Sequence, residues 1–421
     1  MSNIYEKIVH EENSQKRNTI WYSLGSICSS ASSMITLLVV TRIMGAEGSG
    51  IFSLAWSAAQ LMLTIGWFST RQYQVSDVQE CFKFYDYYYA KVISTILMMI
   101  CAIVYVRIYG YSQEQSITTL LLCVLMICEV FADFYGGFWQ HKGKLHIAGK
   151  SYVLRNGAYV LTFIIILCVV KNIWAAIAGA IIVAATCILV FDVTIKKKFY
   201  NNDIKRIQIK RSLLIFKECF PLFIGSFITS FVMNIPKNSI NKYLSNDIQA
   251  VYNILFMPSS VINMFTLFLC VPYYDKLALL WYEQKYAEFK KLIQKMIIIV
   301  CGITAVILIG GGTVGIPILT WLYGVSLKPY RVPFLILLAG GGITGIISIL
   351  TYTITVMRKQ QIIAILYGCV AVIAQVIAGI MVKRYEITGA TVTYAGAMLL
   401  LGMVFGALVW KWIRKSLKQR I

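Results

Sequence analysis

Two acidic side chains, Glu129 and Asp133, lie within a long apolar stretch of the chain. Their spacing of four residues places both on one face of a helix. An ionisable group at the centre of a membrane helix costs about 2.5–3.5 kcal/mol, so each is a candidate functional residue. Lys91 and Arg155 occur in neighbouring apolar stretches. The four residues could form buried ion pairs that stabilise helix packing, or Glu129 or Asp133 could couple transport to a proton or Na⁺.

The apolar stretch 214–236 and the residue after it contain a second group of candidates. Lys217 and Pro221 lie near its beginning, and Pro236 and Lys237 lie at its end. Proline removes a backbone hydrogen bond, so two prolines in one helix permit local bending. Four of the chain's seven prolines occur in this stretch and the next apolar one. The pattern is compatible with ordinary kinks and with a conformational role.

Membrane helices must position these residues, because the chain is too apolar for a soluble domain. Hydrophobic residues make up 58% of its 421 residues and charged residues 14%, and the mean hydropathy is +0.71. Backbone groups in lipid must bond internally, so the apolar stretches are expected to be helices and the fold all-α. Twelve stretches can each cross about 30 Å of hydrocarbon, at 20–42, 49–69, 87–109, 116–139, 151–170, 172–194, 214–236, 248–273, 289–310, 332–357, 361–382 and 388–411.

The placement of the basic residues predicts an orientation. With a cytoplasmic N-terminus, the cytoplasmic connections contain 26 of the 39 Lys and Arg residues, and the opposite face contains nine, including Arg42. Such a bias over short loops is a strong positive-inside signal. We therefore expect both termini in the cytoplasm. The formal charge of +21 then reflects membrane orientation, and no nucleic-acid partner is expected.

A weak internal repeat predicts two halves of similar construction. Shifting the sequence by 200 residues aligns 17–54 with 217–254 without a gap. Such repeats are typical of transporters with a substrate site between the halves. The basic segment at mid-chain could contact anionic lipid or nucleic acid, but a cytoplasmic hinge is the simpler interpretation. The expected division is a six-helix bundle at 1–195, a basic linker at 196–212 and a second, parallel six-helix bundle at 213–421.

Several chemical functions find no support in the residues. The chain has no Asp-x-Asp, no Gly-x-Ser-x-Gly and no phosphate-binding loop. Its 11 cysteines are dispersed without a Cys-x-x-Cys, and it has only three histidines. We therefore expect no metal site and no cofactor, and we expect that the protein is not an enzyme. A membrane-embedded glycan-modifying enzyme or a scaffold for a glycan-assembly complex is a less favoured alternative.

The first apolar stretch has a series of small polar residues. Serines recur through it, and they could permit close helix packing or face a hydrated cavity. Glycines in the second half, including Gly341 and Gly345, form a Gly-x-x-x-Gly pattern that predicts close packing. The serines are Ser23, Ser26, Ser29, Ser30, Ser32 and Ser33.

Four segments of the chain resemble one known family. They are TRIMGAEGSGIF at 41–52, NIPK to YN at 234–253, YG to PFLILLA at 323–339, and YEITGA at 385–390. In order and on a twelve-helix frame, these segments resemble the Wzx-type flippases of O-antigen and capsule precursors. These flippases belong to the multidrug/oligosaccharidyl-lipid/polysaccharide (MOP) superfamily. One departure is Asn241, where relatives often have an aspartate, so acid-based coupling at that position is in doubt.

The resemblance implies a substrate and a location. The substrate would be an undecaprenyl-diphosphate-linked oligosaccharide, moved from the cytoplasmic to the outer leaflet of the bacterial cytoplasmic membrane. Glycosyltransferases or a glycan polymerase would be possible partners. Its diphosphate requires cations in the cavity, and Pro221 and Pro236 would serve bending during alternating access. The candidate diphosphate ligands are Lys237, Arg155, Lys217, Arg42 and Lys91.

The main alternative is a cation-coupled multidrug exporter of the same superfamily, for which Glu129 and Asp133 would be the coupling residues. The flippase interpretation predicts that Lys237→Ala and Arg155→Ala each impair glycan export at normal protein levels. Wild-type surface glycan in both variants would contradict it. An unchanged drug susceptibility on deletion would count against drug export.

Overall fold

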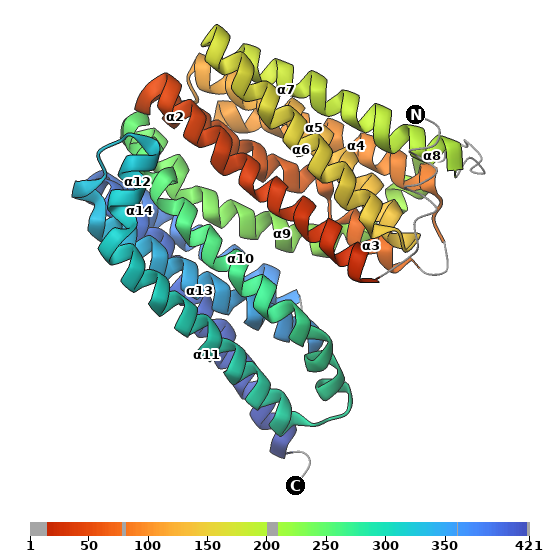
Figure 1. The fold of residues 1–421 in the computed structure, drawn as a ribbon. Helices are drawn as coiled ribbons and strands as arrows, with labels where there is room; N and C mark the ends of the chain where they lie inside the picture. Colours follow the sequence, from red (N-terminus) through yellow and green to blue (C-terminus); the bar gives the residue numbers. More distant parts are fainter. Residues whose placement is uncertain (1–14, 78–80, 200–208, 360, 419–421) are drawn as a thin grey trace. The chain divides into compact units, whose positions relative to one another are not determined.

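The expected all-helical architecture is confirmed in the part of the chain that the structure describes. The computed structural model describes residues 15–77, 81–199, 209–359 and 361–418. All regular structure within these ranges is helical, and no strand occurs there. The chain forms two compact units, Met1–Phe227 and Ile228–Ile421 (Figure 1). The expected linker 196–212 lies partly outside the described residues.

The first unit consists of helices connected by short turns. Its elements are α2 (Gln15–Trp67), α3 (Thr70–Ser76), α4 (Phe84–Ile108), α5 (Gln113–His141), α6 (Leu145–Val170), α7 (Ile173–Cys187), the π-helix η1 (Ile188–Val193), α8 (Thr194–Phe199) and the beginning of α9 (Ile209–Tyr243). Two helices begin at N-caps that the sequence supplies. The Ser112 hydroxyl accepts the Gln115 N–H before α5, and Asn172 accepts two N–H groups before α7.

The second unit contains the remainder of α9 and seven further helical elements. These are α10 (Asn246–Tyr282), α11 (Tyr286–Gly310), the π-helix η2 (Gly311–Gly315), α12 (Ile316–Tyr323), the short 3₁₀-helix η3 (Lys328–Tyr330), α13 (Arg331–Val356) and α14 (Gln361–Lys418). The glycines of α13 allow close packing, as expected. A Cβ on Gly341 would lie 2.7 Å from Ser259, and one on Gly345 would lie 2.7 Å from Thr266.

Two helices contain a sharp change of direction where the sequence predicts a turn. Gly45 interrupts α2 with a φ of 74°. Glu386 interrupts α14 with a φ of 49°. Both values lie in the left-handed region, which glycine adopts without strain and other residues adopt less readily. Each long helix therefore comprises two segments, at the places where the expected stretches 20–42 and 361–382 end.

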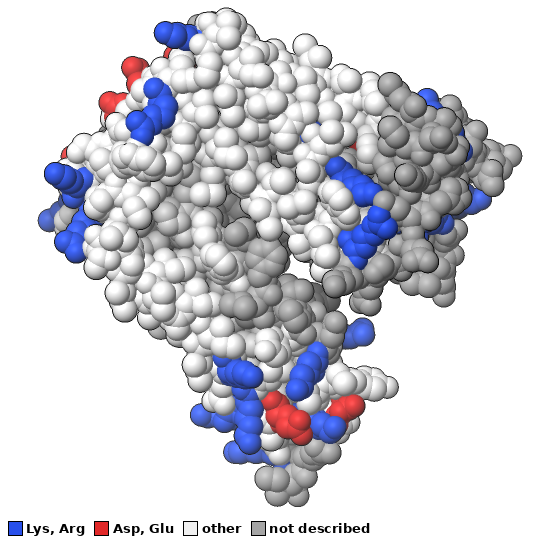
Figure 2. Space-filling model, viewed as in Figure 1, with Lys and Arg blue, Asp and Glu red and all other residues white. Residues whose placement is uncertain are grey.

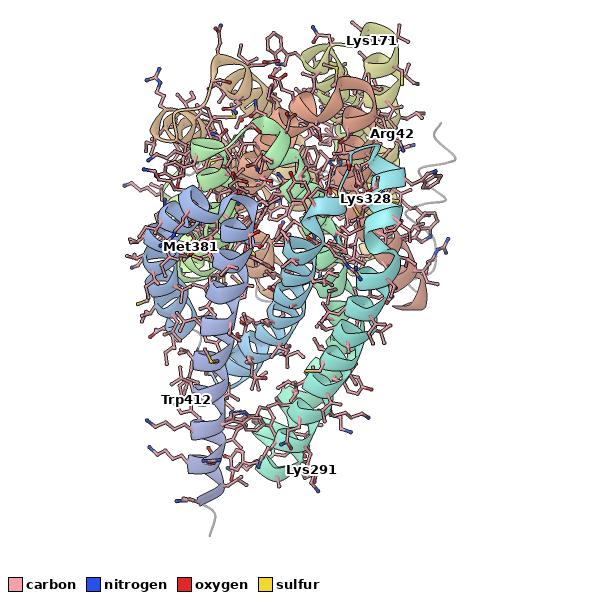
Figure 3. All side chains as sticks on the ribbon, turned by 90° about the vertical axis from the view of Figure 1, so that its left-hand side faces the viewer. Arg42, Lys171, Lys291, Lys328, Met381 and Trp412 are labelled. Carbon is pink, nitrogen blue, oxygen red and sulfur yellow. The ribbon has the colours of Figure 1, made fainter. Side chains whose placement is uncertain are left out.

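The helices have the length and surface of membrane-spanning segments. Among the described residues, nine helices are long and apolar enough to cross a bilayer. On the face shown in Figure 2, charged side chains gather near helix ends, and long stretches between them carry none. In the second unit, Lys291 and Trp412 lie at one end and Lys328 and Met381 at the other (Figure 3). The protein is a multi-pass membrane protein.

Packing of α2 against α6 organises the first unit, and the two helices lie side by side in Figure 1. Glycines permit the close approach. A Cβ on Gly149 would overlap the backbone of Trp21, and one on Gly25 would lie 2.9 Å from the Gly149 carbonyl oxygen. Further along the same interface, the rings of Phe52 and Phe163 are 5.8 Å apart and fully buried. The interface therefore holds α2 in register against α6.

The beginning of α9 is attached to the first unit by polar contacts. The Arg211 Nε lies 3.1 Å from the Asp86 carboxylate, and the Ser212 hydroxyl donates to the Asp86 carbonyl at 2.9 Å. From there, α9 is one continuous α-helix through both prolines. Pro221 is exposed and Pro236 is buried. Their expected role in bending stays a prediction.

Candidate functional site

A break between α2 and α3 creates the site. Phe68 and Ser69 both adopt left-handed backbone conformations, with φ values of 45° and 53°. Such conformations are costly for non-glycine residues and persist only where surrounding contacts enforce them. Here the Phe68 ring stacks on Phe223 with centroids 4.1 Å apart, and it meets Phe216 edge-on at 4.6 Å. The break directs α3 against α5.

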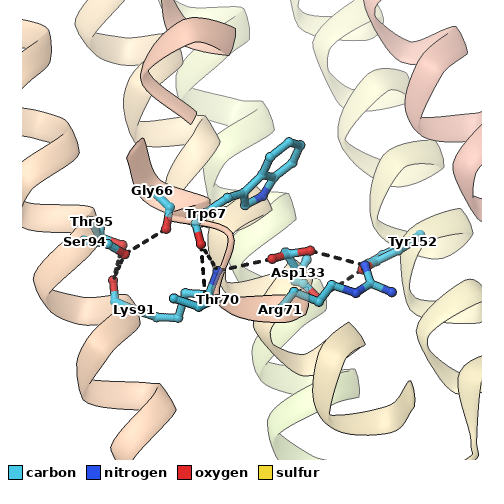
Figure 4. Close-up of polar contacts among 10 residues, drawn as sticks. Gly66, Trp67, Thr70, Arg71, Lys91, Ser94, Thr95, Asp133 and Tyr152 are labelled. Carbon is cyan, nitrogen blue, oxygen red and sulfur yellow. Dashed lines mark hydrogen bonds and ion pairs between the residues drawn. The ribbon is translucent and has the colours of Figure 1, made fainter. Parts of the chain in front are cut away.

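The end of α2 leaves carbonyl groups without helical partners, and polar side chains satisfy them (Figure 4). The Ser94 hydroxyl donates to the Gly66 oxygen at 2.8 Å. The Trp67 oxygen accepts from the Lys91 ammonium at 3.0 Å and from the Thr70 hydroxyl at 3.1 Å. Lys91 therefore binds a helix end, where the peptide dipoles favour a positive charge.

Asp133 joins two cations from different helices (Figure 4). One carboxylate oxygen lies 3.2 Å from Lys91 Nζ of α4, and the other lies 3.2 Å from Arg71 Nη1 of α3. The same Arg71 nitrogen donates to the Tyr152 hydroxyl at 2.9 Å, and Arg71 Nη2 donates to Gln140 at 2.9 Å. Asp133 and its neighbours thus connect α3, α4, α5 and α6.

Glu129, one helical turn before Asp133, pairs with Arg155. The two guanidinium Nη groups donate to the two carboxylate oxygens, the second at 2.9 Å. The Arg155 side chain is only 2% exposed. This is the bidentate geometry that makes arginine–carboxylate pairs strong.

A cavity of about 360 Å³ opens beside these pairs. Serines of α2, aromatic side chains and four charged residues line it together. The lining residues are Tyr22, Ser26, Ser29, Ser30, Trp67, Arg71, Glu129, Asp133, Tyr152 and Arg155. Three serines of the series, Ser26, Ser29 and Ser30, line this cavity. Ser32 instead accepts a hydrogen bond from Tyr159 at 3.0 Å and serves packing.

The structure brings together some of the predicted residues. Glu129, Asp133 and Arg155 line one cavity, and Lys91 contacts Asp133 from α4. The structure confirms that these four residues form ion pairs, Lys91 with Asp133 and Arg155 with Glu129. A coupling role for either carboxylate stays a prediction.

The other predicted residues lie elsewhere. Arg42 is exposed, close to the turn at Gly45 (Figure 3), and Lys217 is exposed on α9. Lys237 belongs to the second unit, where its ammonium lies 5.0 Å from the centre of the Phe256 ring. Their roles as diphosphate ligands stay predictions.

Sequence reasoning missed Arg71, Trp67 and Tyr152. The sequence places Arg71 in a cytoplasmic connection, because the preceding apolar stretch is expected to end at residue 69. The structure instead turns the chain back at Phe68 and Ser69 and places Arg71 against Asp133. No feature of residue type or spacing at 68–71 indicates this return, because distant aromatic contacts enforce it.

Charges of both signs line the cavity in equal number. Arg71 and Arg155 face Glu129 and Asp133, while Lys91 contacts Asp133 from behind the cavity wall. Within the described residues, no group of three or more His, Cys, Asp or Glu side chains could hold a metal ion. The two arginines that line the cavity give it guanidinium groups, which bind carboxylate and phosphate oxygens.

The chain is similar to known proteins over most of its length. Residues 16–274 match the family model described as polysaccharide biosynthesis protein. The chain is 22% identical over 392 residues to the capsular polysaccharide biosynthesis protein CapF of Staphylococcus aureus. The aligned region covers 90% of this chain and 94% of CapF.

Solved structures show the same fold at low identity. A multidrug resistance MATE family transporter of the MOP superfamily, in an inward-facing conformation, matches with a TM-score of 0.69 and 13% identity, over 92% of this chain and 95% of that one. A MOP superfamily transporter from Pyrococcus furiosus matches with a TM-score of 0.63 and 14% identity, over 98% and 96% of the two chains. Because the family model matches more than half of the chain, this protein belongs to the polysaccharide biosynthesis protein family, and its fold is that of the MOP superfamily.

Proposed function

We propose that this protein is a transporter that moves an undecaprenyl-diphosphate-linked oligosaccharide from the cytoplasmic to the outer leaflet of the bacterial cytoplasmic membrane. The observation that supports this most is the cavity of the first unit. Two arginines and two carboxylates line it within a membrane-spanning bundle. Charges at this depth are expensive, and arginine binds phosphate oxygens through paired N–H groups, so these arginines favour an anionic cargo such as a diphosphate.

The remaining lining of the cavity suits the polar part of such a cargo. The hydroxyls of Ser26, Ser29 and Ser30 can bond sugar hydroxyls or the water around them. Tyr22 and Trp67 offer flat apolar faces. Most of the lining residues are serines or charged residues, so the wall is suited to a polar cargo. The lipid tail would stay in the bilayer.

The membrane topology of the proposal is twelve crossings with both termini in the cytoplasm. The nine membrane-spanning candidates include α2 and α14, which have 53 and 58 residues. A crossing needs about 20 residues, so each of these helices is long enough for two, with the turns at Gly45 and Glu386. With α2 and α14 each crossing twice, the nine candidates would make eleven crossings, and the 37-residue α10 would make the twelfth.

In the proposed mechanism of alternating access, the two six-helix bundles move relative to each other. The bundles are expected at 1–195 and 213–421, joined by the linker 196–212. Pro221 and Pro236 of α9 would permit bending, and Lys217, Lys237 and Arg42 would supply further cations on the path. Glycosyltransferases or a polymerase would produce and use the cargo. A proton or Na⁺ coupled through Glu129 or Asp133 would drive transport.

A second candidate function is multidrug export, which the MATE family fold favours. The pairing of both cavity carboxylates with Arg71, Lys91 and Arg155 opposes it, because a cationic drug would have to displace these cations to bind either carboxylate.

Deletion of the gene in its host separates the two functions. We expect loss of surface polysaccharide, measured by immunoblotting and by sugar analysis of the cell surface, and restoration by the wild-type chain on a plasmid. Drug susceptibility should stay unchanged. Normal surface polysaccharide together with increased drug sensitivity would contradict the proposal and support drug export.

Lys237→Ala is expected to reduce surface polysaccharide at least tenfold in the complemented deletion strain, because the cation sits within the bundle of the second unit beside Phe256. Membrane levels of the variant, measured by immunoblotting, should be normal. The matched control is Lys242→Ala, which removes an exposed lysine from the same helix. Equal export by both variants would exclude Lys237 as a substrate ligand.

A further inference from the structure

We infer that Arg71 is the residue that binds the anionic group of the cargo, with Asp133 as its resident counter-ion. This inference rests on the proposed function. It differs from the sequence-based expectation, which assigned this role to Arg155, Lys91, Arg42 and Lys217 in the first unit and to Lys237 in the second.

Exposure to the cavity distinguishes the three cations. The Arg71 side chain lines the cavity and is 16% exposed. The Lys91 side chain is only 1% exposed and is not among the residues that line the cavity. The Arg155 side chain lines the cavity but is only 2% exposed. Of the three, Arg71 is the cation that a ligand could reach without a rearrangement of the bundle.

Hydrogen-bonding capacity leads to the same residue. A guanidinium has five N–H donors. Three of those of Arg71 donate to described residues, namely Asp133, Tyr152 and Gln140. Two donors therefore remain for a ligand. Arg155 uses both of its Nη groups on Glu129, and its Nε is buried without a partner, so its outer edge is already occupied by a carboxylate.

The surroundings of Arg71 have the form of a built site. The consecutive glycines Gly136 and Gly137 of α5 leave the space that its side chain occupies. A Cβ on Gly137 would lie 3.1 Å from Arg71 Cγ, and a Cβ on Gly136 would overlap the Tyr152 hydroxyl and lie 3.5 Å from Arg71 Nη1. The Arg71 guanidinium also lies 5.3 Å from the centre of the Tyr22 ring. Its orientation is thus defined on several sides before any ligand binds.

Asp133 occupies the position that a phosphate oxygen would take. Its carboxylate bridges Arg71 and Lys91 at 3.2 Å from each. A carboxylate and a phosphate accept the same arginine N–H groups, and a diphosphate has more charge and more acceptor oxygens. The diphosphate could therefore compete with Asp133 for Arg71. Lys91 would meanwhile keep Asp133 and the end of α2 in place, because its ammonium contacts both the Asp133 carboxylate and the Trp67 carbonyl.

The direct test measures binding of inorganic pyrophosphate to the purified full-length protein by isothermal titration calorimetry. We expect Arg71→Lys to weaken binding at least tenfold, because lysine keeps the charge but loses the planar fork. Asp133→Asn should tighten binding at least threefold, because it removes the competing carboxylate. Lys197→Ala, at an exposed site on α8, serves as the control. Wild-type affinity in Arg71→Lys, or no tightening in Asp133→Asn, would overturn the inference.

A neutral substitution separates ligand binding from a structural ion pair. Arg71→Gln leaves Asp133 paired with Lys91 at 3.2 Å, so export should stay near wild type if Arg71 only neutralises Asp133. If Arg71 binds the cargo, this variant should stay at least tenfold below wild type in surface polysaccharide despite a normal membrane level. Where it does not accumulate, Arg71→Lys gives the answer, since it retains the pair with Asp133.

Failure of the inference is distinguishable from failure of the proposed function. If the wild-type chain restores surface polysaccharide in the deletion strain and the Arg71 variants do so equally, the inference is wrong and the function stands. The same holds if wild-type protein does not bind pyrophosphate at all. If the wild-type chain is not needed for surface polysaccharide, the proposed function itself is wrong.

Discussion

Replacing Arg155 with methionine is expected to lower the free energy of unfolding by about 3–5 kcal/mol, because it leaves the Glu129 carboxylate without its partner inside the bundle. The arginine is 2% exposed and donates through both Nη groups to Glu129. The measurement is the midpoint of thermal unfolding of the detergent-purified protein, together with its level in the membrane. The sequence alone predicted normal levels for Arg155→Ala, and the geometry changes that expected result.

The control for this prediction removes both charges. Arg155→Met combined with Glu129→Gln should recover most of the lost stability, because no unpaired charge remains. Export should recover with it if Arg155 stabilises the bundle and does not bind the cargo. A destabilised double variant, or a single variant as stable as wild type, would show that the pair does not contribute in this way.

The second large effect is expected from Gly149→Ala in α6. The added Cβ would overlap the backbone of Trp21 in α2, and backbone atoms cannot move aside as a flexible side chain can. We expect a loss of about 3 kcal/mol or more, at the upper end for overpacking. Thermal unfolding and membrane level again provide the measurement.

Gly157→Ala is the matched control on the same helix. Gly157 is exposed and helical, and nothing lies within 4 Å of the position of its Cβ. Alanine is favoured over glycine in a helix interior by about 0.5–1 kcal/mol, so this variant should be at least as stable as wild type. Equal losses in the two variants would mean that close packing of α2 on α6 is not the cause.

These predictions separate two roles for intramembrane charge. Arg155 and Glu129 form a closed pair whose donors and acceptors serve each other, so its removal should affect stability first. Arg71 retains donors toward the cavity, and its partner Asp133 is shared with Lys91. Its conservative replacement should therefore affect ligand binding more than folding. One cavity thus combines a pair for stability with a cation for the cargo.

The sequence by itself determined the class of the protein. Apolar stretches of membrane-spanning length predicted helices, and the turns at Gly45 and Glu386 fall between expected stretches. These features depend on local composition, and the backbone of a segment in lipid has few alternatives to a helix. The sequence also placed Glu129 and Asp133 on one helix face and proposed Lys91 and Arg155 as their partners.

Only the tertiary structure decided which cation meets which carboxylate and which of them faces the cavity. That outcome depends on the rotation and packing of α2 to α6, which no single segment encodes. Arg71 is the clearest example. It enters the site because Phe68 and Ser69 adopt left-handed conformations, and Phe216 and Phe223, about 150 residues later, hold Phe68 in place. A contact between such distant residues leaves no local pattern, so the structure was needed to find it.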